Sequence, residues 1–291
     1  MSWKVTLNAI QNPIPRFAQS LIIAGWIGTL LWLERKRTLR RIANCKLVRD
    51  LRNLGVAAGS GIVMQFMDAP VAFYLAAKAD ENGWGLLPRL PFPPLLRGLL
   101  ALTLLDYTLY LWHFLTHRVP FLWRFHQVHH LDVEMDATTA LRFHFGEIAI
   151  SVLFRAGQII LIGPSRLSVA VWQMFLIACI LFHHSNVRLP IRAERRLARL
   201  LVTPRLHGIH HSVEPKLVNS NWSSGLTIWD WLHGTLRTEV PQATIVMGVA
   251  GFRDSKFQNL KTLYKLPFRS CAPVPPMPPD TTRQPLSSLA E

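Results

Sequence analysis

The chain has 291 residues, of which 50% are hydrophobic and only 17% are charged. Soluble proteins carry about 25% charged residues, so this composition excludes an ordinary soluble domain, and the apolar content excludes global disorder. Three cysteines in a chain this long exclude a disulfide scaffold, and their lack of CxxC spacing gives no sign of a thiolate zinc site or an iron–sulfur cluster. The formal net charge of +15 indicates basic loops beside anionic lipids rather than nucleic-acid binding.

The first third of the chain contains three apolar runs. Residues 17–33 form a run of 17 residues, near the lower limit for a membrane span, and no signal-peptidase site follows it. The stretch 34–52 contains eight lysines and arginines, which predicts a cytoplasmic loop. Second and third spans are expected at 54–77 and 95–112, with the Gly- and Pro-rich stretch 82–94 as an external loop.

Two shorter apolar runs follow, 148–162 and 167–182. Both fall short of the roughly 20 residues that cross a bilayer core, so we expect a tilted helical hairpin or a shallow re-entrant pair. Either form returns the chain to the side from which it came. Two polar residues inside the first run, Arg155 and Gln158, are interpreted as snorkelling towards the interface rather than lining a head-group pocket.

The predicted fold is therefore an all-α membrane protein. It has four to five apolar helices, three spanning and the others forming the short hairpin, with a cytoplasmic histidine-rich helical cap. We expect a multi-pass protein with N-terminal spans and a basic loop at 1–94, a histidine-box catalytic region at 95–240, a cytoplasmic cap at 241–266 and a Pro-rich disordered tail at 267–291.

The twelve histidines all lie between His113 and His233, and most fall into three boxes, HFLTH, HQVHH and HGIHH. Residues at i, i+3 and i+4 share one helix face, so such rings can converge on a metal. Neutral imidazole suits iron, zinc and copper. Eight ligands are too many for one ion, so we predict two ions with open positions. The eight boxed residues are His113, His117, His126, His129, His130, His207, His210 and His211.

Other polar residues are further candidates for this site. His184, at the end of the fifth apolar run, is preferred as a ligand to His183, because neighbours on a helix point about 100° apart. His144 is either a ligand or a hydrogen-bonding residue beside the site, and His233 is interpreted as a spectator. Asp106, two helical turns before the first box, either orients a box histidine or bonds another helix.

The boxes, in this order and together with TALRFH, FHHSN and NWSSGLTIWDWLHGT, resemble the fatty acid hydroxylase/sterol desaturase superfamily from about Asp106 to Arg237. Members are integral membrane non-haem di-iron oxygenases. The resemblance therefore implies two iron ions on the cytoplasmic face, held by the three boxes and His184. It also implies O₂-dependent hydroxylation or desaturation of a membrane lipid of sterol, fatty acyl or isoprenoid type, with no catalytic side chain beyond the metal centre.

The resemblance also extends to residues around the boxes. Asn221 and Asp230 match family positions downstream of the third box and would support the ligands. The chain departs from the family at Phe145, where proline is frequent, and at His233, where an aromatic residue is frequent. Neither departure falls in a box, but the first leaves the role of His144 open.

Such an oxygenase needs electrons from elsewhere. The chain has no GxGxxG motif for a flavin or nicotinamide and no CxxC cluster, so the implied partner is a separate donor, a ferredoxin or a cytochrome with its reductase. The basic stretches 34–52 and 191–205 could steer an acidic carrier, although topology and lipid head groups suffice to explain them.

Three other functions were weighed against this one. A histidine-lined metal transporter would hold its ligands near the bilayer midplane, whereas the boxes fall at the ends of spans. A haem electron-transfer membrane protein would need only opposed single histidines. A zinc hydrolase would need a general base, and the chain contains no HExxH motif.

Overall fold

The computed structural model describes residues 11–269, 271–277 and 284–290. In these ranges the regular elements are helices, and the only β pairing consists of isolated bridges. The all-α prediction is therefore confirmed. The long helices are α2 (Arg16–Lys36), α3 (Lys46–Val63), α4 (Ala69–Asn82), α5 (Pro94–Arg118), α7 (Phe145–Ile162) and α8 (Arg166–His184). The shorter helices are α6 (Pro120–His130), α9 (Ile191–Leu197), α10 (Pro204–His210), α11 (Pro215–Val218), α12 (Ile228–Leu232) and α13 (Leu260–Arg269), with 3₁₀ turns at Leu87–Arg89, Thr139–Leu141, Gln242–Thr244, Ser255–Phe257 and Leu286–Ser288.

Among the residues that the structure describes, five helical segments are long and apolar enough to cross a membrane: α2, the continuous α3–α4 unit, α5, α7 and α8. Large apolar side chains on them face outward, among them Phe66, Leu95 and Leu153, which are 74%, 76% and 77% exposed. Such a surface fits contact with lipid chains. The expected short hairpin is longer than predicted, with 18 residues in α7 and 19 in α8, because both helices continue into polar and histidine residues at their ends.

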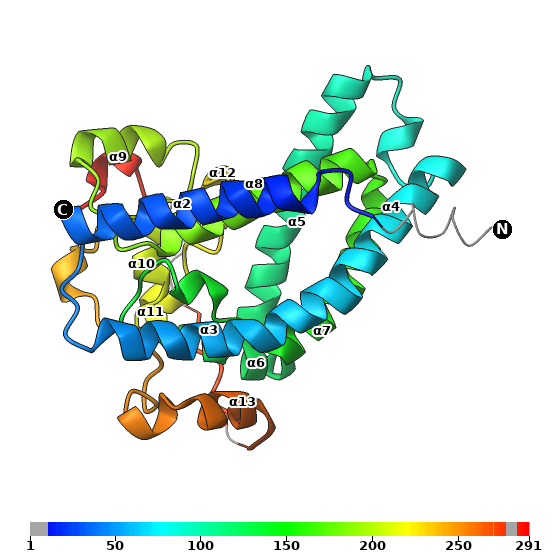
Figure 1. The fold of residues 1–291 in the computed structure, drawn as a ribbon. Coiled ribbons are helices and arrows are strands. Elements are labelled where there is room, and N and C mark those ends of the chain that lie inside the picture. The colour runs from blue at the N-terminus through cyan, green and yellow to red at the C-terminus, as the bar shows by residue number, and fades with distance from the viewer. Residues whose placement is uncertain (1–10, 270, 278–283, 291) are drawn as a thin grey trace.

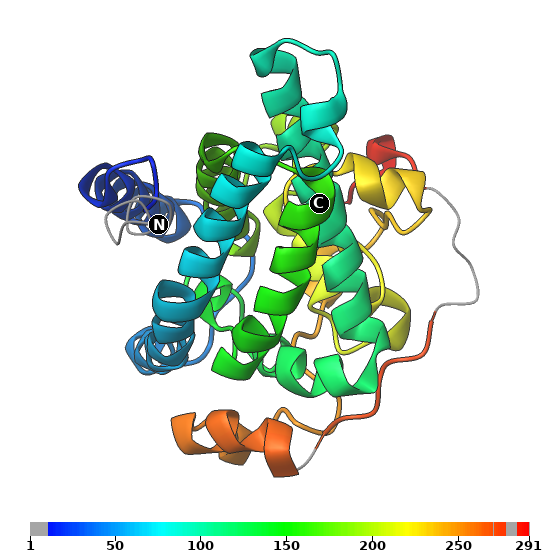
Figure 2. The ribbon, with the colours of Figure 1, turned by 90° about the vertical axis from the view of Figure 1, so that its right-hand side faces the viewer.

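The loops that connect the spanning helices meet at two ends of the bundle, which can be followed in Figures 1 and 2. At the histidine end, the loop after α2 meets the end of α8, where Leu39 N donates to Asn186 O over 2.9 Å. At the other end, the loop after α4 meets the α7–α8 turn. Gly85 and Gly163 have φ angles of +88° and +69° there, and a Cβ on either would overlap backbone of the other loop. Only glycine fits both the left-handed conformation and this close approach.

A π-helical turn, Met64–Asp68, joins α3 to α4 and turns Asp68 into the bundle. Such turns insert an extra residue into a helix and shift the face that follows. Asp68 lies 3.6 Å from the Nε atom of Arg155 on α7, and the Arg155 guanidinium lies 4.6 Å from the ring centroid of Trp172. The snorkelling interpretation of Arg155 was therefore wrong, and Gln158 also turns inward, donating to Thr108 Oγ1 over 2.6 Å.

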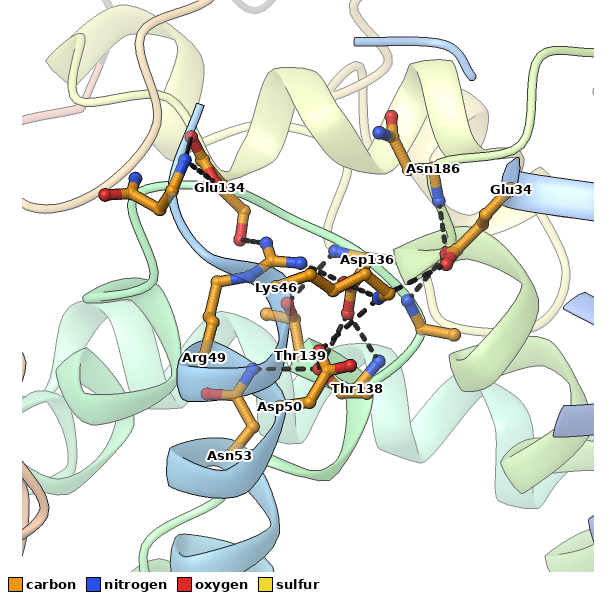
Figure 3. Close-up of polar contacts among 12 residues, drawn as sticks. Glu34, Lys46, Arg49, Asp50, Asn53, Glu134, Asp136, Thr138, Thr139 and Asn186 are labelled. Atoms are coloured by element: carbon orange, nitrogen blue, oxygen red, sulfur yellow. Dashed lines mark hydrogen bonds and ion pairs between the residues drawn. The ribbon is translucent and has the colours of Figure 1, made fainter. Parts of the chain in front are cut away.

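The expected basic loop 34–52 is in large part helix and buried polar network (Figure 3). Asp136, in the segment that connects α6 to α7, accepts hydrogen bonds from the Arg49 guanidinium and from Lys46 Nζ. Glu34 accepts from the backbone N–H groups of Ala137 and Asn186. Burial alone would raise the pKa of Asp136, but the neighbouring cations Arg49 and Lys46 hold it below its ordinary value. This network, the Asp136 cluster, fastens α2 and α3 to the segment between α6 and α7.

We predict a large loss of stability when Asp136 is replaced by Asn. The change leaves the buried Arg49 guanidinium without its carboxylate, and removal of one partner of a buried ion pair costs about 3–5 kcal/mol. Asp50 offers a matched control, because its side chain is 23% exposed, forms its ion pair with the partly exposed Lys46 at 3.4 Å and accepts from Thr138 Oγ1 over 3.3 Å. Its replacement by Asn should cost at most about 1 kcal/mol. Equilibrium unfolding in detergent measures both variants, and equal losses would contradict the prediction.

The C-terminal region packs on the histidine end of the bundle. The expected cap, 241–266, contains two of the 3₁₀ turns and most of α13, which lies against α3 and α6. The expected disordered tail differs from the structure in its described parts. The Ala272 carbonyl accepts from Trp123 Nε1 over 3.1 Å, and Leu289 is 1% exposed in a cluster with Leu206. A proline-rich chain in an extended conformation makes no internal hydrogen bonds, so its carbonyls are free to accept from other groups. In this tail they accept from buried side-chain donors such as the Trp123 indole N–H.

Candidate metal centre

The predicted histidines come from four separate segments, and the fold brings nine of them together. The first box ends α5, Pro120 then starts α6 with the second box, His184 ends α8, and α10 carries the third box. All nine are buried. They form two groups, in each of which the candidate ligand atoms lie within 4.8 Å of one another: a five-histidine group of His113, His117, His126, His130 and His210, and a four-histidine group of His129, His184, His207 and His211.

Three rings of the five-histidine group are held from behind by their Nδ1 atoms. His113 Nδ1 lies 2.6 Å from the Trp222 carbonyl, His126 Nδ1 lies 2.8 Å from Glu147 Oε1, and His210 Nδ1 lies 2.8 Å from the Ser220 carbonyl. An acceptor at Nδ1 places the proton of a neutral imidazole there and leaves the Nε2 lone pair free. These bonds therefore orient three rings for use through Nε2.

The free nitrogens of this group are buried without hydrogen-bond partners among the described residues. They are Nε2 of the three oriented rings and both nitrogens of His117 and His130. Buried polar atoms are normally bonded, and each exception needs an explanation. Five nitrogen lone pairs in one buried space match the ligand set of a metal ion. The apolar neighbours supply no group that could bond these lone pairs instead. The residues present therefore fit a bound metal.

The four-histidine group has its Nε2 atoms in mutual contact. His184 Nε2 lies 2.9 Å from Nε2 of His129 and 2.9 Å from Nε2 of His207, which is 3.1 Å from Nε2 of His211. His184 Nδ1 is already bonded to the Ile180 carbonyl over 2.8 Å. Two imidazole nitrogens bound at right angles about 2.1 Å from one ion lie about 3 Å apart. The observed spacing therefore also fits ligands of one ion.

The two groups adjoin each other. The rings of His130 and His211, one from each group, stack with centroids 4.3 Å apart. Burial and the neighbouring imidazoles lower the pKa values of five rings well below their ordinary value, those of His129, His130, His207, His210 and His211. The rings are thus neutral at neutral pH, which is the form that binds metals.

Arg40 supports the third box from outside. Its guanidinium is buried, donates to the Pro204 carbonyl and to Gln242 Oε1, and lies against Gly208 within the box. Its backbone is bonded in both directions to the side chain of Asn186, two residues beyond His184. Burial lowers the pKa of Arg40 to about 9. One residue of the loop after α2 thus fixes two of the ligand-bearing segments.

We expect Gly208→Ala to damage the third box. A Cβ at this position would overlap the Arg40 guanidinium, which its bonds to Pro204 and Gln242 prevent from moving away freely. Overpacking of this kind costs about 1–3 kcal/mol, and the displaced α10 should bind metal more weakly. Thermal unfolding and metal content measure the two effects. In an Arg40→Ala background the overlap is absent, so adding Gly208→Ala should cause little further loss of stability or metal. A further loss as large as in the unaltered background would contradict this explanation.

The segment after the third box, 219–230, carries the carbonyls that orient the ligands. Asn221 adopts a positive φ of 51° and bonds the Leu206 carbonyl and both backbone groups around Arg237. Asp230 accepts from the N–H groups of Trp222 and Ser223 over 2.9 Å. Asp230 therefore holds the backbone of this segment, and Asn221 joins the segment to the Leu206 carbonyl on the third-box helix α10; within the described chain neither side chain is hydrogen-bonded to a ligand ring.

Asp106 also serves this segment. Its carboxylate accepts from Leu226 N over 2.9 Å and from Trp229 Nε1 over 2.7 Å. Of the two alternatives for Asp106, the bond to a box histidine is the one that the structure contradicts. Although Asp106 lies on the helix that carries the first box, its carboxylate is turned towards the Leu226 N–H and the Trp229 indole N–H.

The three remaining histidines lie outside both groups. His144 caps α7, accepting from Gly146 N at Nδ1, while its Nε2 lies 3.2 Å from the Tyr264 carbonyl, so neither nitrogen is left for a metal. His183 faces the His207 ring at 4.0 Å without joining the group. His233 is exposed and stacks on Tyr110 at 4.9 Å.

Two functional residues were missed by the sequence analysis. Glu147 was placed just outside the apolar run, yet it is 5% exposed and holds His126. The sequence feature that could have identified Glu147 is a carboxylate in the first turn of an apolar helix. Arg40 was counted among loop cations, and no pattern in the sequence separates it from its exposed neighbours.

Comparison with known proteins agrees with this geometry. The family model described as fatty acid hydroxylase matches residues 98–235. The chain is 31% identical over 161 residues to ornithine lipid hydroxylase OlsE of Rhizobium tropici, covering 55% of this chain and 47% of that protein. It is 31% identical to human alkylglycerol monooxygenase over 46% of this chain and 29% of that one, and 30% identical to human cholesterol 25-hydroxylase over 48% and 51%.

These matches centre on the histidine-rich region. The chain spans about half or less of the length of these curated relatives, and no solved structure matches it significantly. The family model nevertheless covers every histidine of the two groups. Residues 98–235 of the chain therefore match the fatty acid hydroxylase family, in agreement with the resemblance of its histidine boxes.

Proposed function

We propose that this protein is a membrane-bound di-iron oxygenase that hydroxylates or desaturates a lipid. The observation that carries the proposal is the pair of adjoining buried groups of five and four histidines at the ends of membrane-spanning helices. Similarity to three kinds of lipid hydroxylase or monooxygenase supports the reaction class. The five-histidine and four-histidine groups would hold one iron ion each.

Bound iron would supply the one-electron and O₂ chemistry that amino-acid side chains lack. The protein's own residues have three tasks. Glu147 and the carbonyls of Trp222 and Ser220 hold the ligand rings in one tautomer and orientation. The buried surroundings of both groups exclude water from the reacting centre. The apolar helices bring a lipid chain to the same depth as the site.

We further propose that the histidine groups face the cytoplasm and that a separate protein delivers electrons. Exposed basic residues lie at the same end of the bundle as the histidines: Arg35 and Lys36 in the last turn of α2, Arg37 directly after it, and Arg188 after α8. An excess of Lys and Arg marks cytoplasmic loops. The same charges favour an acidic electron carrier such as a ferredoxin or a cytochrome.

The substrate class follows from the relatives only in outline. Their printed activities concern an ornithine lipid, an alkylglycerol and cholesterol, which share a long apolar part and a polar end. We propose a membrane lipid of this general kind as the substrate. The lipids named for these relatives differ in their polar ends, so they do not favour one class of lipid over another.

Lipid mass spectrometry tests the reaction. Lipids are compared from cells that express the chain and from cells that express His207→Ala, a variant of the four-histidine group. A lipid that gains 16 mass units, or loses 2, only with the unaltered chain supports the proposal. Identical lipid profiles, with iron bound and an electron donor supplied, would contradict it.

A further inference from the structure

Outside the nine histidines, the site is bordered by two buried tryptophans. Trp222 and Trp123 are 0% and 1% exposed, and their rings lie 6.2 Å and 5.1 Å from that of His117. The Trp123 indole N–H donates to the Ala272 carbonyl, whereas the Trp222 indole N–H has no partner within the described chain. A buried, unbonded N–H is unfavourable, so Trp222 fills its position at a cost that phenylalanine would avoid.

Trp222 also differs from Trp123 in the aromatic rings that lie next to it. Its ring is 6.4 Å from Tyr110, Tyr110 is 6.5 Å from Tyr107, and Tyr107 is 4.9 Å from Trp229. Tyr110 is buried, whereas Tyr107 and Trp229 are half-buried. A row of oxidisable rings thus leads from the five-histidine group to the protein surface beside α12. The ring contacts of Trp123 within the described chain reach only histidines.

Tyr110 has a route for its proton. The Thr235 hydroxyl donates to Asp230 Oδ1 over 2.7 Å, so its oxygen is left to accept from the Tyr110 hydroxyl 3.2 Å away. Oxidation of a tyrosine requires that the phenolic proton leave with the electron. The Thr235 hydroxyl and the Asp230 carboxylate are placed to take it. Burial also raises the pKa of Asp230 above its ordinary value, which favours proton uptake.

We propose that Trp222, Tyr110, Tyr107 and Trp229 form an electron path between the surface and the metal centre. The proposal rests on the proposed function, because only a redox-active metal would use such a path. Electron transfer slows steeply with distance, and the row divides a long step into short ones. The oxidant is the oxidised metal centre, and the reductant is a one-electron carrier docked near α12.

The electrons and protons balance in each passage. Trp222 gives one electron to the metal centre and recovers one from Tyr110. Tyr110 passes its proton to Thr235 as Thr235 passes its own to Asp230. The carrier then supplies one electron to Tyr110 by tunnelling across the Trp229 and Tyr107 rings, neither of which is oxidised, and the proton returns to Tyr110. The net change is one electron moved from the carrier to the metal centre, with no residue altered.

The test uses the full-length, iron-loaded protein in lipid nanodiscs. The reduced protein is exposed to O₂ without lipid substrate and frozen for electron paramagnetic resonance. The unaltered chain should give a tyrosyl or tryptophanyl radical signal, and oxidised peptides should map to Tyr110 and Trp222. In Tyr110→Phe and Trp222→Phe the signal should fall at least tenfold. Re-reduction of the centre by methyl viologen radical should slow by a similar factor.

Trp123→Phe is the matched control, since Trp123 is equally buried and nearer to the histidines but has no row of rings behind it. It should keep both the radical signal and the re-reduction rate. Absence of a radical in the unaltered chain, or unchanged signals in both test variants, would overturn the electron path while leaving the oxygenase proposal intact. Failure of the purified chain to bind iron at all would overturn both proposals.

Discussion

Replacing His129 by Ala should abolish turnover and remove about one metal ion per chain. The four-histidine group would keep only three imidazoles, and His184 would lose one of its two Nε2 neighbours at 2.9 Å. Loss of a residue that merely supports a ligand costs 10–100-fold in metal affinity or activity, so loss of a ligand should cost about 100-fold or more. Metal content by mass spectrometry and lipid oxidation assays measure the two effects.

A matched control separates loss of a ligand from loss of a histidine. His144 is equally buried but lies outside both groups, where it caps α7. His144→Asn preserves an N-cap acceptor and should retain the full metal content. Both variants should insert into the membrane. A His129→Ala protein with an unchanged metal count would remove the second box from the metal site.

The second large effect is expected at Glu147. Glu147→Ala removes the acceptor that fixes His126 in its Nδ1–H tautomer, and a freely rotating ring binds metal less well. We expect the affinity of the five-histidine group for metal to fall about 10–100-fold, while the four-histidine group is unaffected. Titration against a chelator of known affinity measures the loss for each ion separately.

Glu147→Gln shows whether the effect is positional. The amide oxygen can still accept from His126 Nδ1, so this variant should recover most of the lost affinity. Thermal unfolding of the metal-free proteins provides the second readout. If Ala and Gln weaken metal binding equally, or if the weakening follows stability alone, the carboxylate is structural and the orientation argument fails.

The number and type of the spans could be predicted from the sequence, because hydropathy reports directly on transfer into lipid. Their bounds could not. The helices α7 and α8 continue past the apolar runs into Glu147 and His184, whose polar atoms are bonded within the bundle. Likewise the π-helical turn at Met64–Asp68 depends on Asp68 finding Arg155, a contact between residues far apart in the chain.

The eight boxed histidines could also be chosen from spacing, because i, i+3 and i+4 positions share a helix face, and His184 could be chosen from its place at the end of the fifth apolar run. Their division into five and four could not be predicted. The second box is split, with His130 in one group and His129 in the other, since adjacent residues on α6 point in different directions. The groups that support the ligands were still harder to predict, because Arg40 and the Trp222 carbonyl reach the site only through tertiary folding.

The most direct test counts metal on the purified, unaltered chain. Mass spectrometry of the metals and the absorption spectrum are measured on the same detergent-purified sample after expression with iron supplied. We expect two iron ions per chain without a haem band, one for each histidine group. A single zinc ion, a haem spectrum, or full membrane insertion with no bound metal would contradict the di-iron centre.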